Sequence, residues 1–298
     1  MRVHHLSCGT FAPPLGGEIV CHVLLCETDD GLVLVDTGLG LDDYADPRGR
    51  LGPVRHLLRP DPTSSQSALR QIEAMGHAAS DVTHIVVTHL DFDHIGGLSD
   101  FPAATVHTTA DEHAAAVTSP DFRDKQRYRP AQWAHGPAWT LHAGRGDEWG
   151  HGLTGHEVLP GITLVPMPGH SKGHAAVAVD VGEGEGDLDT RPSSLGANSI
   201  TGGGGPSSLG ANSISGDGEQ VLFHAGDAVF DASSYADTSP AGRPLEKVGV
   251  IRAFEKVVGR DGAAIRRNHE TLRTLDATDG ITVIPAHDKR IFDDMAGS

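Results

Sequence analysis

The chain has 298 residues and is acidic, with 40 Asp and Glu against 23 Lys and Arg and a formal net charge of -17 at pH 7. Its length allows one large domain or two ordinary ones, and it is ample for a hydrophobic core without disulfide support. The negative charge argues against nucleic acid or an anionic membrane as the main partner, because both attract basic surfaces. The expected partner is a small-molecule substrate.

The sequence also lacks the features of exported and membrane proteins. The amino terminus has no long apolar core of a signal peptide, and no apolar run is long enough to cross a membrane. Three cysteines, Cys8, Cys21 and Cys26, form an odd number without a Cys-x-x-Cys pair, which is typical of reduced thiols. We therefore expect a cytoplasmic protein.

The first third of the chain predicts strands followed by a helix. Residues 19–26 and 32–35 are apolar runs, and Asp29-Asp30-Gly31 between them is a hairpin signal. Residues 41–62 are rich in Asp, Pro and Arg and predict a surface connection. Thr63 and Gln66 have the spacing of a capping box for a helix that ends at Gly76.

The middle of the chain alternates strand and helix patterns, as in an α/β layer. Residues 85–87 and 105–107 predict strands, and Thr109 with Glu112 predicts a helix that runs to residue 117. Residues 121–150 combine several arginines with all three tryptophans. This segment is either a wall or lid facing a substrate or an amphipathic surface helix.

Strands are predicted again at residues 162–165, 175–179, 220–223 and 281–284, with a mainly helical stretch at 245–276. Residues 182–219 are rich in Gly and Ser and contain the sequence PSSLGANSI twice. Two polar copies are too few for a solenoid, so this segment predicts a flexible insertion in one domain that spans 1–298.

The densest chemical signal is Thr88-His-Leu-Asp-Phe-Asp-His-Ile-Gly-Gly97, which directly follows a predicted strand. It places four side chains that bind metals within six residues: His89, Asp91, Asp93 and His94. Imidazole nitrogens and carboxylate oxygens together suit zinc, iron or manganese. Three later residues, His170, Asp227 and His287, also follow predicted strands, and metal sites are often built from strand ends.

These motifs resemble those of the metallo-β-lactamase superfamily of hydrolases. The resemblance rests on Val35-Asp-Thr-Gly38, the Thr88–Gly97 block, Pro168-Gly-His-Ser-Lys-Gly-His174, Gly226-Asp227 and Ala286-His-Asp288, in family order. It implies an αββα sandwich, in which two mixed β-sheets pack face to face with helices on both outer faces. It also implies two divalent metal ions, of which zinc is the expected one.

The resemblance assigns the ligands residue by residue. It places His89, Asp91 and His170 on the first metal, Asp93, His94 and His287 on the second, and Asp227 on both. The family usually has His where this chain has Asp91, and the harder oxygen donor is expected to suit manganese or iron better. Alternatively, Asp91 does not reach the metal and the first site is weak or empty.

The extra carboxylate changes the expected charge of the centre. Two divalent ions with Asp91, Asp93 and Asp227 leave +1, where the usual ligand set leaves +2. This difference predicts a higher pKa for the bound water than in relatives with His at that position.

Within the superfamily, the chain looks nearest to lactonases that open N-acyl homoserine lactones. Those enzymes resemble one another in a Tyr three residues after the bridging Asp, where this chain has Phe230. Tyr235 is a candidate substitute. The mechanism implied is attack of a metal-bridging hydroxide on a small ester or lactone carbonyl, with Asp93 as the catalytic group that passes a proton to the leaving group.

Two other functions compete with hydrolysis on the same fold. One is an iron-dependent redox enzyme similar to sulfur dioxygenases, and the other is a non-catalytic descendant. Two further residues are left with two interpretations each. Asp36 either hydrogen-bonds a ligand histidine or caps the turn after its strand, and His174 either orients a ligand or supports a turn.

Overall fold

Two mixed sheets form the centre of the molecule. The structure, a computed structural model, describes residues 1–14, 17–183 and 219–296. The first sheet has the order β1-β2-β3-β4-β5-β6, and its strands are β1 (Arg2–Phe11), β2 (Ile19–Thr28), β3 (Gly31–Val35), β4 (Val82–Val86), β5 (Thr105–Thr109) and β6 (Ala138–His142). The pairs β1–β2 and β2–β3 are antiparallel, and the pairs from β3 to β6 are parallel.

The second sheet has the order β12-β11-β10-β9-β8-β7. Its strands are β7 (Asp147–Gly150), β8 (Leu153–Leu159), β9 (Ile162–Pro166), β10 (Ala175–Glu183), β11 (Glu219–Gly226) and β12 (Ile281–Pro285). Only β11 and β12 run parallel, and the other described pairs are antiparallel. Both sheets are therefore mixed, as the αββα prediction requires.

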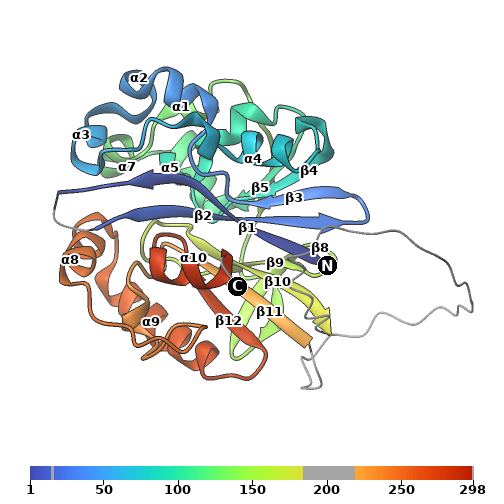
Figure 1. Ribbon diagram of the computed structural model, residues 1–298, viewed down its shortest axis with the longest axis vertical. Helices are drawn as coiled ribbons and strands as arrows, with labels where there is room; N and C mark the ends of the chain where they lie inside the picture. The colour runs from blue at the N-terminus through green and yellow to red at the C-terminus, as the bar shows by residue number, and fades with distance from the viewer. Residues whose placement is uncertain (15–16, 184–218, 297–298) are drawn as a thin grey trace, which may run out of the picture.

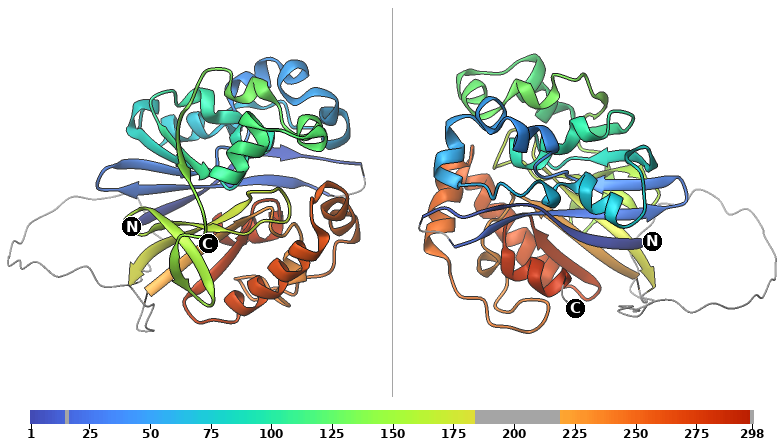
Figure 2. Two further views of the ribbon diagram at one scale, coloured as in Figure 1. Left: turned by 180° about the vertical axis from the view of Figure 1, so that it is seen from behind. Right: turned by 45° about the horizontal axis from the view of Figure 1, so that its top comes forward.

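Helices cover the outer faces of both sheets (Figures 1 and 2). On the first sheet lie α1 (Leu41–Ala45), α2 (Pro47–Leu51), α3 (Arg55–Leu58), α4 (Ala68–Ala74), α5 (Phe92–Ile95), α6 (Ala110–His113) and α7 (Phe122–Arg127). On the second lie α8 (Gly249–Val258) and α9 (Gly262–Asp276), whereas α10 (Lys289–Ala296) packs against β1, β2 and β12. The predicted sandwich is confirmed. Among the described residues, no helix has the length and apolar character needed to cross a bilayer.

The central strands are buried on both faces, which explains their nearly continuous apolar runs. In β2, Leu24 and Cys26 face the core between the two sheets, while Val23 and Leu25 face the core under the helices of the first sheet. All three cysteines are buried free thiols.

Several predicted boundaries were wrong. The connection predicted at 41–62 contains α1, α2 and α3, and its Arg50 is buried and donates to Asp43 at 2.8 Å. The capping box at Thr63 is not formed, and α4 begins after Ser67, whose hydroxyl accepts from the backbone N–H of Arg70. The helical stretch at 245–276 is two helices. The repeats within 182–219 lie outside the described residues.

Three histidines on neighbouring strands of the first sheet form a hydrogen-bonded row. The two ring nitrogens of His107 lie 2.9 Å from Nδ1 of His84 and 3.2 Å from Nε2 of His142. Burial is the main cause that lowers the pKa of His107, and repulsion from the imidazoles of His84 and His142 adds to it, so that the pKa is about 4. In the folded protein, His107 therefore stays mostly neutral until the pH approaches 4.

This row predicts a loss of stability in mild acid. The unfolded chain returns His107 to an ordinary pKa of about 6.5, so between about pH 6.5 and 4 the unfolded state binds a proton that the native state does not. The free energy of unfolding should therefore fall as the pH falls through that window. Urea unfolding at pH 7.5 and pH 5 should show a smaller drop for His107→Gln than for the wild type. The exposed His151→Gln is the control, and an equally steep drop in both variants would contradict the prediction.

Candidate metal centre

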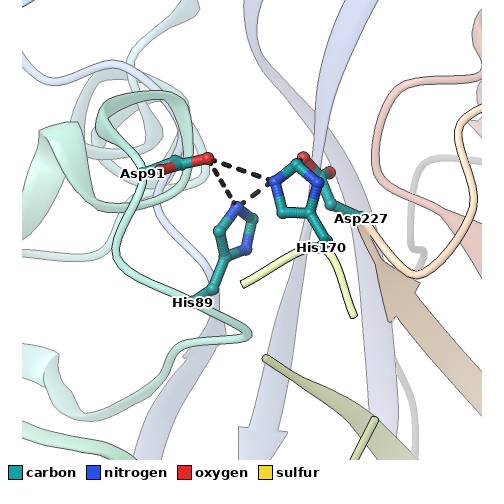
Figure 3. Close-up of side chains that lie close together, drawn as sticks. All are labelled: His89, Asp91, His170 and Asp227. Atoms are coloured by element: carbon teal, nitrogen blue, oxygen red, sulfur yellow. Dashed lines mark hydrogen bonds and ion pairs between the residues drawn. The ribbon is translucent and has the colours of Figure 1, made fainter. Parts of the chain in front are cut away.

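The seven predicted ligands converge at one edge of the sandwich, beyond the ends of β4, β9, β11 and β12. They form two groups in which the candidate ligand atoms lie within 4.8 Å of one another: His89, Asp91, His170 and Asp227 in the first, and Asp93, His94 and His287 in the second. Figure 3 shows the side chains of the first group pointing toward one another. The arrangement brings together every residue of the predicted set, and their roles as ligands stay a prediction.

Asp227 lies between the two groups. Its Oδ2 is 3.0 Å from Nε2 of His170 and 3.6 Å from Nε2 of His89. Its Oδ1 is 3.0 Å from Nε2 of His287 and 3.3 Å from Nε2 of His94. Burial opposes its charge, but the imidazoles of His287, His94 and His170 bring the pKa of Asp227 well below its ordinary value. One ionised carboxylate therefore faces both groups, which is the geometry that a bridging ligand needs.

The imidazoles of the second group are oriented by their Nδ1 atoms. Nδ1 of His94 lies 2.8 Å from Oδ2 of Asp36, and Nδ1 of His287 lies 2.8 Å from the backbone oxygen of Val20. Both Nε2 atoms consequently point into the site, where they are 3.2 Å apart. Burial disfavours a charged His94, yet Asp227 and Asp36 raise its pKa well above the ordinary value. Nitrogens and carboxylates that together favour positive charge are a donor set that fits a divalent metal ion.

Asp36 and His174 both support candidate ligands. Asp36 has a left-handed φ of 59° and accepts hydrogen bonds from the backbone N–H of Thr88 at 2.8 Å and from its hydroxyl at 2.9 Å. His174 is 3.1 Å from the Met167 oxygen through Nδ1, so its Nε2 accepts from the backbone N–H of Asp227 at 2.9 Å. For both residues, the interpretation as the partner of a candidate ligand is the one that the contacts support.

Glycine is required immediately before Asp227. Gly226 has a φ of 51°, and a Cβ there would lie 2.8 Å from Nε2 of His174 and from Cβ of Thr88. Only a residue without a side chain allows the strand end to approach His174 so closely. The local backbone of Gly226 thus sets the position of the Asp227 carboxylate.

Two residues of the site were missed in the sequence. Glu112, fully buried, accepts four hydrogen bonds, from Leu90 N at 2.9 Å, Tyr128 Oη at 2.8 Å, Ser171 Oγ at 2.6 Å and Gly173 N at 3.1 Å. The sequence predicts Glu112 only as part of a helix start, and the Thr109 hydroxyl does cap α6 by accepting from the backbone N–H of Glu112. Arg127 is the second missed residue. Its one signal was membership of the basic segment 121–150.

Arg127 changes the charge expected around Asp91. Its Nε lies 2.7 Å from Oδ1 of Asp91 and its Nη2 lies 2.5 Å from Oδ2. Burial opposes the charge of Asp91, but Arg127 brings the pKa of this carboxyl well below its ordinary value. The guanidinium adds one positive charge, so the sequence-based count of +1 becomes +2. The basis for predicting a higher pKa of the bound water is therefore removed.

A cavity of about 420 Å³ opens above the two groups. Asp91, Asp93, Asp227 and His287 border it on one side, and its apolar wall includes Phe11, Ile19, Leu58, Phe92, Phe230 and Phe254. Helix α7 supplies another wall through Arg123 and Arg127. Within 121–150, α7 thus lines the cavity, and its role toward a substrate stays a prediction. Residues 138–142 and 147–150 are strands of the two sheets.

Phe230, three residues after Asp227, borders the cavity beside two of the candidate ligands. Its ring centroid is 5.5 Å from that of His170 and 5.3 Å from that of His287. Tyr235 is not a substitute, because it does not border the cavity and its hydroxyl donates to the Val283 oxygen at 3.1 Å. Tyr128 borders the cavity, but its hydroxyl donates to Glu112.

Several known proteins are similar to this chain in sequence or in fold. A family model described as "Metallo-beta-lactamase superfamily" matches residues 16–265. "Probable metallo-hydrolase Rv2300c" of Mycobacterium tuberculosis is 54% identical over 186 residues, which are 61% of this chain and 59% of the relative. "N-acyl homoserine lactonase AttM" of Rhizobium radiobacter is 29% identical over 162 residues, or 54% of this chain and 60% of the relative. Each match thus spans less than two thirds of the relative.

Solved structures share the fold across nearly the whole chain. A variant of AiiA from B. thuringiensis with N-decanoyl-L-homoserine at its active site has a TM-score of 0.62 at 17% identity, covering 97% of this chain and 93% of its own. A probable metal-dependent hydrolase from Staphylococcus aureus has a TM-score of 0.60 at 17% identity, covering 96% and 89%. At this identity the likeness concerns the fold.

Proposed function

The chain belongs to the metallo-beta-lactamase superfamily, and on this premise we propose that it is a metal-dependent hydrolase of small esters or lactones. The observation that supports the proposal most strongly is the position of Asp227 between two groups of candidate ligands at the floor of the cavity. When bound there, two divalent ions would lower the pKa of water and polarise a carbonyl. Zinc is the expected metal, and the Asp91 oxygens would also suit manganese or iron.

The chain's own residues divide the remaining tasks. The first metal would be held by His89, Asp91 and His170, the second by Asp93, His94 and His287, and both by Asp227. Asp93 borders the cavity, and its Oδ2 lies 3.6 Å from Nε2 of His287. This position suits a carboxylate that passes a proton from the attacking water to the leaving oxygen.

The walls of the cavity suggest which substrates to test first. The apolar wall suits a hydrocarbon group, which gains free energy when it leaves water. Phe230 cannot donate a hydrogen bond to a carbonyl, and neither Tyr128 nor Tyr235 has a hydroxyl free to replace it. An N-acyl homoserine lactone has a second, amide carbonyl for which these three side chains offer no donor. We therefore propose aryl esters and simple lactones, which have one carbonyl, ahead of N-acyl homoserine lactones, the substrates named for AttM.

The test is hydrolysis by the purified full chain loaded with zinc or manganese, against the same protein treated with a chelator. We expect turnover of phenyl esters or of unsubstituted γ- and δ-lactones that the chelator abolishes and added metal restores. No turnover of any ester or lactone by the loaded protein would refute the proposal. Oxygen consumption by the iron-loaded protein would favour the redox enzyme instead.

A further inference from the structure

Arg127, at the end of α7, is held by contacts to all of its donor groups. Nε and Nη2 donate to the two carboxylate oxygens of Asp91 in a bidentate contact. Nη1 donates to the backbone oxygens of His170 at 2.9 Å and Val258 at 3.0 Å, and Nη2 also contacts Nε2 of His170. A guanidinium has five N–H groups, so these contacts use the whole set. These contacts fix the position of the Arg127 side chain, which is only 17% exposed to solvent.

Two of these contacts involve the group that would hold the first metal. Nε2 of a neutral imidazole has one lone pair, so that of His170 either accepts from Arg127 or binds a metal ion. The Asp91 carboxylate already has a full bidentate partner, and a divalent ion that binds it must be near a fixed positive charge. In the second group, no basic side chain competes with a metal ion for the ligands: among the described residues, no Arg or Lys contacts His94, His287 or Asp93.

We propose that Arg127 competes with the first metal ion for Asp91 and His170, so that the pocket binds one divalent ion tightly and a second one weakly. The proposal rests on the metal-dependent function proposed above. It makes Arg127 a residue that sets the number of ions bound at a given metal concentration.

The test is zinc binding to the chelator-treated full chain, measured by calorimetry in the presence of a competing chelator. In the wild type we expect one tight event and a second that is at least about tenfold weaker. Arg127→Gln removes the competing charge and should tighten the second event at least about tenfold, leaving the first unchanged. Arg127→Lys keeps the charge but cannot form the bidentate contact to Asp91. The zinc affinity of its second binding event should therefore lie between those of the wild type and Arg127→Gln.

Two further variants make the assignment specific. Lys125→Gln removes the same charge from an exposed position on α7 and should leave both events as they are. Asp91→Asn should abolish the weak event and preserve the tight one. Urea unfolding of each variant verifies that it is folded before zinc is added.

The outcomes separate this proposal from the proposed function. Two zinc ions bound with equal affinity by the wild type, or a second event that weakens in Arg127→Gln, would show that Arg127 supports the first site, and would overturn the competition while leaving the hydrolase proposal intact. Absence of any zinc binding would overturn both.

Discussion

Replacing Asp227 with Asn should lower the rate of hydrolysis about a thousandfold and reduce the amount of bound metal. The amide is neutral and turns a donor toward Nε2 atoms that now face a carboxylate at 3.0 to 3.6 Å. The loss in kcat/KM should exceed the 10- to 100-fold that is typical for the loss of a residue that only orients a ligand, so about a thousandfold is expected. Metal content measured by elemental analysis should fall by at least one ion per chain.

Asp237→Asn is the matched control for this variant. Asp237 is exposed and lies ten residues farther along the same connection, outside the cavity lining. It should retain the activity and metal content of the wild type. An Asp227→Asn protein that keeps both ions and more than a tenth of the wild-type activity would show that Asp227 does not bridge the two groups.

Replacing Glu112 with Ala should cause the largest loss of stability. The carboxylate lies in the core and accepts from four donors on three segments, and Ala leaves all four without this partner. Buried donors that lose their acceptor each cost about 1–3 kcal/mol, partly relieved by relaxation, so the free energy of unfolding should fall by about 3–5 kcal/mol. Urea unfolding at pH 7.5 measures it.

The same variant should weaken metal binding, since Leu90 follows His89 and Ser171 follows His170 in the chain. Glu112→Gln keeps one acceptor oxygen and should lose less stability than the Ala variant. The control is Glu73→Ala, which removes an exposed carboxylate paired with Arg70 and should change stability by less than about 0.5 kcal/mol. Equal stability of the Glu112 and Glu73 variants would contradict the proposed role of Glu112.

The convergence of the candidate ligands was predictable because it follows from local patterns. His89, His170, Asp227 and His287 each follow an apolar run, and such runs become strands buried on both faces. Strands that end at one edge of a sandwich bring the residues after them together, whatever the connections between them. The strands β1, β6, β7 and β8 were not predicted, because their partly exposed positions dilute the apolar pattern.

The sequence by itself determined the residue types of the candidate centre, their order and the fold class that gathers them. Only the tertiary structure decided what surrounds them. Asp91 contacts Arg127, which is 36 residues away in the sequence, and Glu112 contacts Ser171, which is 59 residues away. Such contacts depend on how α6 and α7 pack over the strand ends, and no local periodicity encodes them. The charge of the centre, and with it the expected strength of the first metal site, is therefore a property of packing.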